Sequence, residues 1–440
     1  MKAYPEYKPS GIDWLDKIPS HWDSMPLKYT VKNQETDFID GDWIESPFIT
    51  ETGVRYLTSG NVGPGFYKEQ GNGFISNETF DKLNCIEVLP GDLLISRLNE
   101  PIARTCEVPE LGYKIVTCVD NVIYRPISDI FSRRFMMYHL NSEPFWFNAS
   151  GLSSGATMKR ISRSKLGNIK VIVPPLKEQE VIAAYLDDVT GKVDALIAEK
   201  QKQVEDLRKY RTSLITETVT RGLNPTTPIR QTNSEWYPNI PYNWNVEKFK
   251  YQASVKANLV HPEDYTKHPQ ISPDSIEKNT GRLLGYRSVE ESGIISDNHL
   301  FFKGQIIYSK IRPNLNKVII APFDGLCSAD MYPIETSNNV RYFQYLMLSN
   351  PFVSQVSVVI QDRVKMPKIN QVELGEIFIV VPPISEQQEI ADYLDKKTTK
   401  IDSLVEELEA QLTDLATYKQ AVITEAVTGK VDVRDWTPKS

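Results

Sequence analysis

The chain has 440 residues, of which 40% are apolar and 24% charged, and its net charge is −7. This length favours two to four globular domains and excludes a single small one. No apolar run approaches the ~18 residues that a membrane-spanning helix needs, and the N-terminus lacks the apolar core of a secretory signal. The four cysteines form no C-x-x-C pair, which argues against a zinc site or a disulfide framework and fits the reducing cytoplasm.

A leading segment near the N-terminus occurs twice in the chain. Residues 14–29 read WLDKIPSHWDSMPLKY, and residues 236–251 read WYPNIPYNWNVEKFKY. Tryptophans at shared positions of two diverged copies are more often packing residues than platforms for stacked bases, so we expect them in the cores. The matched tryptophans are Trp14, Trp22, Trp236 and Trp244.

Short β-rich runs bounded by glycine and proline follow in each copy and predict strands. Residues 132–145 and 339–352 predict short helices, again in matching places. Each copy therefore predicts a module of mixed α and β structure. The β-rich runs are EVLPGDLLIS (87–96), CVDNVIYRPI (118–127), GQIIYSK (304–310) and NKVIIAPF (316–323).

Each module ends in a related motif that opens a long helix. Residues 173–189 read VPPLKEQEVIAAYLDDV and residues 381–397 read VPPISEQQEIADYLDKK, with ten of 17 positions identical. Apolar residues then recur at spacings of three and four, which is typical of a helix that packs along its length against another helix. The predicted seam or partner-interface residues are Ile182, Leu186, Val189, Val193, Leu196, Leu207, Leu214, Ile390, Leu394, Ile401, Leu404, Leu408, Leu415 and Val422.

The ends of both helices carry start and stop signals. SEQQ at 385–388 has the Ser-x-x-Gln form of a capping box, and Gly222 and Gly429 are stop signals. The first helix would then run over residues 178–221, or ~66 Å at ~1.5 Å per residue. Gly191, after Thr190, marks a point where this helix can kink.

The repeat divides the chain into four parts, which are residues 1–174, 175–222, 223–382 and 383–440. The fold class is α+β, with two mixed α/β modules separated by two long helices. The offset between the copies falls from 222 residues at the leading segment to 208 at the helix motif, so the first module carries 14 more residues in its interior. A shared frame with a diverged interior suits two modules that recognise different targets.

In this order of parts the chain resembles the specificity subunit of a type I restriction-modification system. The resemblance covers nearly the whole chain and also includes the IPSHW and IPYNW segments and the helix endings ITETVTRGL and ITEAVTGKV. It implies that each module is a target-recognition domain that reads one half of an interrupted, asymmetric DNA site. It also implies that the two long helices lie antiparallel, hold the domains at a fixed separation and dock two modification (methyltransferase) subunits.

The resemblance further implies a non-catalytic, cytoplasmic chain. S-adenosylmethionine, ATP and Mg would belong to partner subunits, and restriction (translocase) subunits would bind through the complex. The alternative from another class is a coiled-coil scaffold whose two modules bind proteins without DNA specificity. A third hypothesis for the function of the chain is an enzyme, such as a fused nuclease.

Basic residues gather in an acid-free stretch of the first module. Between Pro144 and Lys177 there is no Asp or Glu, and the centre, SSGATMKRISRSK at 153–165, mixes small residues, hydroxyls and cations. Small residues permit close approach of the backbone to phosphate, and hydroxyls donate to it. DRVKMPK at 362–368 takes the equivalent place in the second module. The candidate DNA-binding residues here are Thr157, Lys159, Arg160, Arg163, Lys165, Arg363, Lys365 and Lys368.

A second pair of candidate segments, SRLNE from Ser96 and SKIRPN from Ser309, follows a predicted strand in each module. Arg and Asn have the bidentate geometry for guanine and adenine edges, whereas lysines neutralise phosphates. A lone basic residue is most simply a solvated surface group. The prediction of DNA binding therefore rests on the clusters of basic residues and not on any single one. The candidates here are Arg97, Asn99, Lys310, Arg312 and Asn314.

Catalytic and metal-binding motifs find little support in the sequence. NPFV at Asn350 lacks the second proline of an adenine methyltransferase loop, and the five histidines do not cluster at ligand spacing. No glycine-rich nucleotide loop follows a predicted strand. We therefore expect no catalytic residue and no metal site in this chain. Glu178, Gln179, Glu386 and Gln387 are explained by helix capping, with contact to a modification subunit as the alternative.

Overall fold

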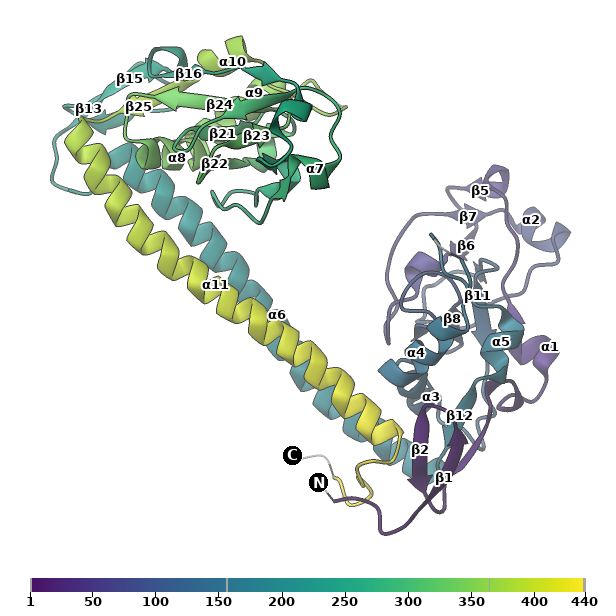
Figure 1. Cartoon of the computed structure of the whole chain (residues 1–440). Coiled ribbons are helices and arrows are strands. Elements are labelled where there is room, and N and C mark those ends of the chain that lie inside the picture. Colours follow the sequence, from purple (N-terminus) through teal and green to yellow (C-terminus); the bar gives the residue numbers. More distant parts are fainter. Residues whose placement is uncertain (1, 156, 364, 438–440) are drawn as a thin grey trace. The chain divides into compact units, whose positions relative to one another are not determined.

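The computed structural model describes residues 2–155, 157–363 and 365–437 (Figure 1). The chain divides into two compact units, Met1–Glu199 with Gln411–Ser440, and Lys200–Ala410. Each unit contains one module and part of each long helix, α6 (Leu176–Arg221) and α11 (Ile384–Val427). No helix within the described ranges is long and apolar enough to cross a membrane.

The first module contains two four-stranded sheets and two strand pairs. One sheet has the order β4 (Phe38–Asp40), β11 (Asn121–Tyr124), β8 (Leu93–Ser96) and β9 (Thr105–Glu107). The other has the order β10 (Ile115–Thr117), β6 (Val54–Leu57), β7 (Phe74–Ile75) and β5 (Ile49–Thr50). The pairs are β1 (Tyr7–Ile12) with β2 (Leu15–Pro19), and β3 (Asp23–Pro26) with β12 (Lys170–Val173). The helices are α1 (Gln34–Asp37), α2 (Asn77–Lys82), α3 (Arg133–Leu140), α4 (Glu143–Gly151) and α5 (Arg163–Asn168).

The second module repeats this frame with a different second sheet. Its four-stranded sheet has the order β16 (Ala253–Val255), β24 (Met331–Thr336), β21 (Ile306–Ser309) and β22 (Val318–Ile320). Its five-stranded sheet has the order β17 (Leu259–Val260), β20 (Asn298–Phe301), β23 (Gly325–Cys327), β18 (Pro269–Ile271) and β19 (Arg287–Ser288). The pairs are β13 (Ile229–Gln231) with β14 (Asn239–Pro241), and β15 (Asn245–Lys248) with β25 (Phe378–Val381). The helices are α7 (Val289–Ser292), α8 (Val340–Leu348), α9 (Asn350–Ile360) and α10 (Gln371–Gly375).

The predicted α+β class is confirmed, and the four β-rich runs contain β8, β11, β21 and β22. Both predicted short helices form, as α3 and α8, and each is followed at once by a second helix that begins at the Glu-Pro or Asn-Pro pair. Proline suits this position because the first turn of a helix leaves its N–H groups without partners.

The matched tryptophans pack in the cores and help to stop the long helices. Trp22 and Trp244 are fully buried, and the other two pack partly buried against the same clusters. Gly429 ends α11 at φ +71°, where a Cβ would lie 2.4 Å from Cδ of Pro19. Gly222 ends α6 at φ +78°, against the ring of Trp244. Only glycine adopts this conformation freely and leaves room for the neighbouring side chain.

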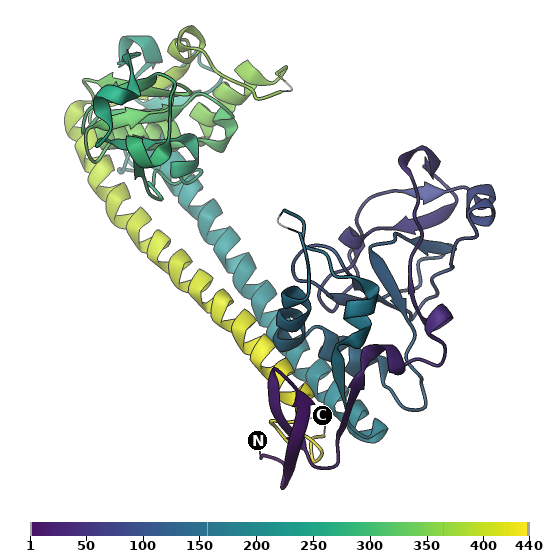
Figure 2. The same cartoon turned by 45° about the vertical axis from the view of Figure 1, so that its right-hand side comes forward.

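Within each unit the segments of the two long helices run antiparallel, side by side, in both views (Figures 1 and 2). In the first unit Lys419 forms an ion pair with Asp194 at 2.6 Å, and in the second unit Arg211 forms one with Asp402 at 2.8 Å. These pairs are equivalent at the offset of 208. Helix α6 continues through Gly191 without a break.

The seam between the helices follows a strict three-four spacing of buried and half-buried residues. Of the 14 residues predicted for it, nine lie in the seam. Ile182, Val189 and Ile390 are buried or half-buried but pack in the core clusters of their own modules and are not seam residues, and Leu196 and Leu404 are exposed. Those two are a correction, because their neighbours Ile197 and Val405 take the seam positions and leave them 46% and 50% exposed on the flank. The seam is Leu186, Thr190, Val193, Ile197, Lys200, Val204, Leu207, Arg211, Leu214 and Thr218 on α6, and Leu394, Thr398, Ile401, Val405, Leu408, Leu412, Leu415, Lys419, Val422 and Ala426 on α11.

The glutamine of each helix motif ties the helix to its own module. Gln179 is fully buried; it donates to the carbonyl oxygens of Pro174 and Ile130 at 2.7 and 3.0 Å and accepts from the backbone N–H of Ser132 at 2.9 Å. The interaction is therefore internal to the module and leaves no surface for a partner. Gln387 donates to the carbonyl oxygen of Pro382 and to the side-chain oxygen of Asn338, and it accepts from the backbone N–H of Asn339.

The predicted capping box at Ser385 is wrong, because α11 already begins at Ile384 and places this serine within the first turn. The glutamate of the motif instead accepts bonds from the N-terminal part of its module. Glu178 accepts from the Tyr4 hydroxyl and from His21 Nε2, and Glu386 accepts from Trp244 Nε1 at 2.8 Å. An acid in the first helical turn also complements the helix dipole.

Candidate nucleic-acid interface

The two basic segments of the first module, which lie about 60 residues apart in sequence, meet in space. Leu98 and Arg160 form an antiparallel bridge. The N–H of Asn99 donates to the carbonyl of Lys159 at 3.0 Å, and the N–H of Ile161 donates to that of Arg97 at 3.0 Å. Residues 97–100 and 157–161 thus form one surface, the first loop pair.

The second module builds the same arrangement from its own two basic segments. Ile311 and Lys368 form the antiparallel bridge, and the N–H of Arg312 donates to the carbonyl of Pro367 at 2.8 Å. The N–H of Ile369 donates to the carbonyl of Lys310 at 3.0 Å. Residues 310–314 and 365–369 form the second loop pair, so all four segments chosen from the sequence take part in two equivalent surfaces.

Arg97 is a correction to the set of candidate contact residues, because its side chain points inward. It is 5% exposed and donates to the carbonyl oxygens of Ile161 and Val119, and it forms an ion pair with Asp40 at 3.0 Å. Burial lowers the pKa of Arg97 and raises that of Asp40, while their mutual attraction opposes both shifts. Arg97 stabilises the loop pair from the interior of the module, and its buried side chain cannot reach a base.

The acid-free stretch of the first module is compensated in space by acids from other segments. Lys159 pairs with Glu100 at 2.8 Å and Arg160 pairs with Asp120 at 2.9 Å. Arg163 lies 3.6 Å from Asp40. The side chains of Lys159 and Arg160 are 49% and 44% exposed, so these ion pairs are weak and can exchange for phosphate contacts.

The remaining candidates of the first loop pair and its surroundings are exposed. Asn99 lies at φ +60°, in the left-handed region that asparagine tolerates better than most residues. Thr157 is exposed, and the Nζ of Lys165 donates to the carbonyl of Leu152 at 3.0 Å.

In the second loop pair Lys368 pairs with Asp330 at 2.9 Å, the counterpart of the Arg160 pair in the first module. Lys310 lies over the ring of Tyr332, with Nζ 5.1 Å from its centre. Arg363 pairs with Glu373 just outside the loop pair. Arg312, Asn314 and Lys365 are exposed and form no side-chain hydrogen bond or ion pair with another described residue.

Arg104 supports the candidate interface from inside the module, and sequence reasoning missed it. It is 8% exposed and holds the first loop pair to a neighbouring turn. Its guanidinium donates to the carbonyl oxygens of Leu98 and Asn99 at 2.8 and 2.9 Å and to those of Ser59 and Val62 at 2.8 Å each. Burial lowers the pKa of Arg104. Arg104 directly precedes β9, for which no strand was predicted, so the sequence offered no signal for this residue.

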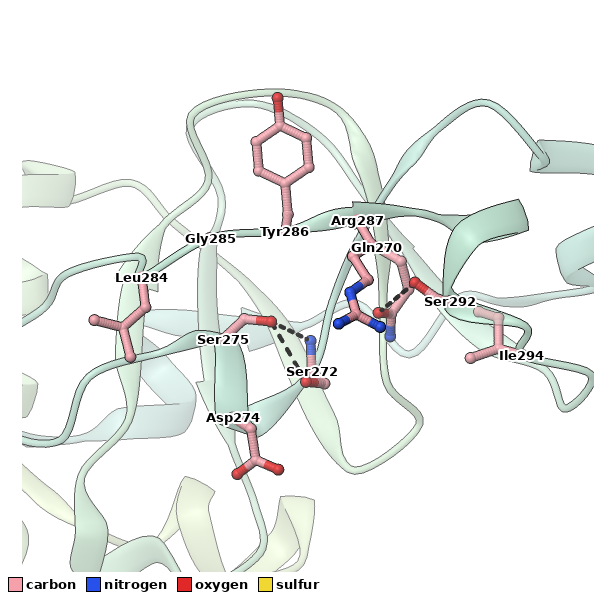
Figure 3. Close-up of a pocket in the computed structure, with 10 residues that line it drawn as sticks. All are labelled: Gln270, Ser272, Asp274, Ser275, Leu284, Gly285, Tyr286, Arg287, Ser292 and Ile294. Carbon is pink, nitrogen blue, oxygen red and sulfur yellow. Dashed lines mark hydrogen bonds between the residues drawn. The ribbon is translucent and has the colours of Figure 1, made fainter. Parts of the chain in front are cut away.

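The second module also has a hollow of about 590 Å³ beside β18 and β19 (Figure 3). Gln270 and Arg287 are paired across these strands and both line it. Ser292 donates to Gln270 Oε1 at 3.4 Å, and the guanidinium of Arg287 is exposed. Leu284 and Tyr286 also line the hollow and are exposed. The irregular loop that carries these residues gave no periodic signal.

No group of three or more His, Cys, Asp or Glu side chains among the described residues is placed to hold a metal ion. The four cysteines are free, and burial raises the pKa of Cys85 to about 11 and that of Cys106 to about 12. A thiol with a raised pKa is a poor nucleophile. The side chains of the loop pairs themselves offer hydrogen bonding and charge neutralisation.

Comparison with known proteins places this geometry in context. Residues 40–206 and 246–414 each match the family described as type I restriction modification DNA specificity domain. The chain is 32% identical over 292 residues to the type I restriction enzyme EcoDI specificity subunit of Escherichia coli, covering 63% of this chain and 66% of that one. It is 20% identical over 325 residues to the EcoBI specificity subunit of Escherichia coli, covering 69% and 66%.

A solved structure shares the fold over nearly the whole chain. Its title describes the structural basis of complex assembly and conformational transition of the type I R-M system. It matches with a TM-score of 0.66 at 12% identity and covers 94% of this chain and 99% of the other.

Proposed function

This chain belongs to the type I restriction-modification DNA specificity family, and from that premise we propose that it reads a bipartite, asymmetric DNA site, one half with each module. A specificity subunit is the non-catalytic member of its complex, and the loop pairs supply recognition rather than reaction chemistry. The observation that carries the proposal is the occurrence of two equivalent loop pairs with different side chains on the same backbone frame.

The difference between the loop pairs supports two different half-sites. At equivalent positions the first presents Asn99 and the second presents Arg312, and both side chains are exposed. Asparagine suits the donor–acceptor pattern of adenine in the major groove, and arginine suits that of guanine. Two modules that present different groups at one position would read different bases, which makes the combined site asymmetric.

The cations of the loop pairs would bind the DNA backbone. Lys159 and Arg160 in the first pair, and Lys368 in the second, are exposed and held only by surface ion pairs. Phosphate oxygens can replace the carboxylates at little cost, because exposed ion pairs contribute only ~0–1 kcal/mol. Such contacts fix the orientation of the module on the duplex and leave the choice of bases to neighbouring side chains.

The long helices would set the separation between the half-sites and dock two modification (methyltransferase) subunits, with restriction subunits joining through the complex. S-adenosylmethionine, ATP and Mg would be bound by those subunits, and the complex would act on DNA in the cytoplasm. The support in this chain is a pair of unbroken helices of 46 and 44 residues whose seam repeats across both units.

The test is a salt series for binding of random duplex DNA, with the full chain alone and with its modification subunit. Neutralised phosphates release counterions, so affinity must fall as salt rises, with a slope near −0.9 per contact. A flat salt response of the complex would exclude the DNA reading and favour a protein-interaction scaffold.

A further inference from the structure

The two modules share a second structural repeat, outside the loop pairs. Strands β6 and β18 each pair in parallel with one neighbour and antiparallel with another, and each runs into a short 3-10 helix. We call residues 58–61 and 272–275, which contain these helices, the first and second capped turns. In each turn the N–H of the first residue donates to the side chain of the last, at 2.8 and 3.2 Å. The two turns share no identical residue, so only the fold reveals the repeat.

Equivalent cations hold both capped turns to the loop pairs. Arg104 directly precedes β9 and Lys317 directly precedes β22, and β9 and β22 are the last strands of the equivalent sheets. Arg104 donates to the carbonyl of Ser59 at 2.8 Å, and the Nζ of Lys317 donates to that of Pro273 at 2.7 Å. The backbone carbonyl of each cationic residue accepts from the N–H of the residue just before its loop pair, at 2.9 and 3.0 Å. Each capped turn therefore lies beside its loop pair.

The chain that follows each capped turn differs between the modules. In both, a short hairpin comes first, closed by an isolated bridge. From the equivalent residues Lys68 and Leu284, whose N–H groups donate to the last residue of the turn, the chain takes residues 69–73 to reach β7 but only two residues to reach β19. The longer segment covers the first capped turn, where Asn61 donates to the carbonyl of Gln70 at 2.8 Å. The second capped turn instead forms part of the wall of the hollow.

Hydrogen-bond donors converge in the hollow of the second module. Figure 3 shows the guanidinium of Arg287 and the amide of Gln270 gathered beside Ser272 of the capped turn. Arg287 is exposed and forms no side-chain hydrogen bond or ion pair with another described residue. By strand register Gly73 takes the place of Arg287 in the first module, which therefore has no cation at that position.

The shape and the donors of the hollow fit the sugar–phosphate ridge of a duplex. Phosphate oxygens only accept hydrogen bonds, and arginine, serine and glutamine side chains are common donors to them. Base edges offer donors as well and lie at the floor of a major groove ~8.5 Å deep, which recessed side chains do not reach. The exposed carboxylate of Asp274 lies 3.6 Å from the Nζ of Lys317, so its charge is compensated. A phosphate in the hollow would therefore meet the unpaired charge of Arg287.

We propose that this hollow binds a phosphate of the DNA duplex whose bases the second loop pair reads, with Arg287 as the main contact and Ser272 and Gln270 as further donors. The inference rests on the proposed function for the presence of the duplex. The second module then holds the DNA backbone at two places, the loop pair and the hollow, whereas the first module uses its loop pair alone. The contact orients the second module on the duplex and does not select a base.

The test is binding of random duplex DNA by the full chain with its modification subunit, measured by fluorescence anisotropy across a salt series. Arg287→Ala should lower the affinity ~10-fold, because a charge-assisted hydrogen bond is lost, and should reduce the salt slope by ~1. Arg287→Lys keeps the charge and should retain the wild-type slope. Lys278→Ala is the matched control, because it removes one exposed cation from the same loop, beside Glu205 and Lys209 of α6, and it should behave like the wild type.

Three results would overturn the inference. The first is an Arg287→Ala variant with the affinity and slope of the wild type, and the second is an equal loss in the Lys278→Ala control, which would make the effect a general one of charge. Mapping of methylated adenines supplies the third: Arg287→Ala should keep both halves of the motif, and relaxation of a base in the second half would show a base contact instead of a phosphate contact. If binding by the wild type does not depend on salt, the proposed function fails instead, so the two failures are distinguishable.

Discussion

Gln179 accepts a hydrogen bond from the backbone N–H of Ser132 at 2.9 Å, and this bond joins the first turn of α6 to the N-cap residue of α3. Gln387 accepts the equivalent bond from Asn339 at 2.8 Å in the second module. A motif repeated for docking would expose its polar groups, whereas both glutamines are fully buried. The repeated Glu-Gln is therefore a joint within each module, and partner binding has to use other residues of the helices.

Replacement of this joint should destabilise one module. Gln179→Leu keeps the volume but leaves a buried N–H and two carbonyl groups without partners, so the free energy of unfolding should fall by about 3 kcal/mol. Chemical denaturation of the full chain measures the change. Glu180→Gln is the control, because it places at an exposed neighbouring position the residue found at the equivalent Gln388, and stability should be unchanged. Equal stability of the leucine variant and the wild type would show that the joint contributes nothing.

His139 should make the stability of the first module sensitive to acid. Its ring is fully buried and stacked on Phe135, and burial lowers its pKa to about 3. The unfolded chain binds a proton near pH 6.5 and the folded one does not, so this stabilising contribution is complete above pH 6.5 and is lost as pH falls towards 3. Between pH 7 and pH 5 it should remove about 2 kcal/mol from the free energy of unfolding.

The second module carries Leu346 where the first has His139, which supplies the variant. His139→Leu should abolish this part of the pH dependence, whereas His261→Asn, at an exposed histidine, should retain it. Chemical denaturation at pH 7 and pH 5 measures both. A leucine variant with the same pH dependence as the wild type would rule out His139 as the cause.

The first loop pair should contribute to DNA affinity without contributing much to stability. Lys159→Ala with Arg160→Ala removes two exposed cations and leaves Glu100 and Asp120 without their partners. Affinity of the complex for random duplex DNA should fall, and the salt slope should shrink by up to ~2. Fluorescence anisotropy across a salt series measures both.

Lys202→Ala with Lys209→Ala removes the same charge from α6 and serves as the control for this experiment. Its DNA affinity and salt slope should match those of the wild type. If the loop variant behaves like this control, the first loop pair does not touch DNA.

The proposal that the helices set the half-site spacing predicts a change of defined size. Inserting one heptad after Lys200 and one after Leu408, the equivalent position of α11, keeps the phase of the seam and lengthens each helix by ~10.5 Å. The gap between the half-sites should grow by about three base pairs at ~3.4 Å each. As the control, seven residues inserted after Thr226, outside both helices, should leave the gap unchanged. If the two helix insertions also leave the gap unchanged, the helices do not set the half-site spacing.

Much of this architecture followed from the repeat alone. The four basic segments could be chosen from the sequence because they recur at matching places in both copies, but their pairing in space was not predicted. The pairing of Arg160 with Asp120, and of Arg97 with Asp40, could not, because these acids come from distant segments and only the folded sheet brings them to the loops. The count of charges along each basic segment therefore gave a larger excess of positive charge than the folded loop pairs have.

The register of the helix seam shows a second limit of the sequence. Leu196 and Ile197 are adjacent and both apolar, so a three-four spacing fits through either one. Packing against α11 decides the choice: Ile197 enters the seam and Leu196 stays on the flank. The prediction of a capping box at Ser385 was wrong for a related reason. The capping pattern is present in the sequence, but the helix already begins at Ile384.

The central claim, that each module reads one half of the site, is tested most directly by mapping methylated adenines across the genome of a host that carries this chain and its modification subunit. The wild type should give one motif with two defined halves and an unspecified gap. Exchange of residues 1–174 for the first module of another specificity subunit should replace one half and preserve the other half and the gap. A single contiguous motif, or a change in both halves after the exchange, would contradict the account.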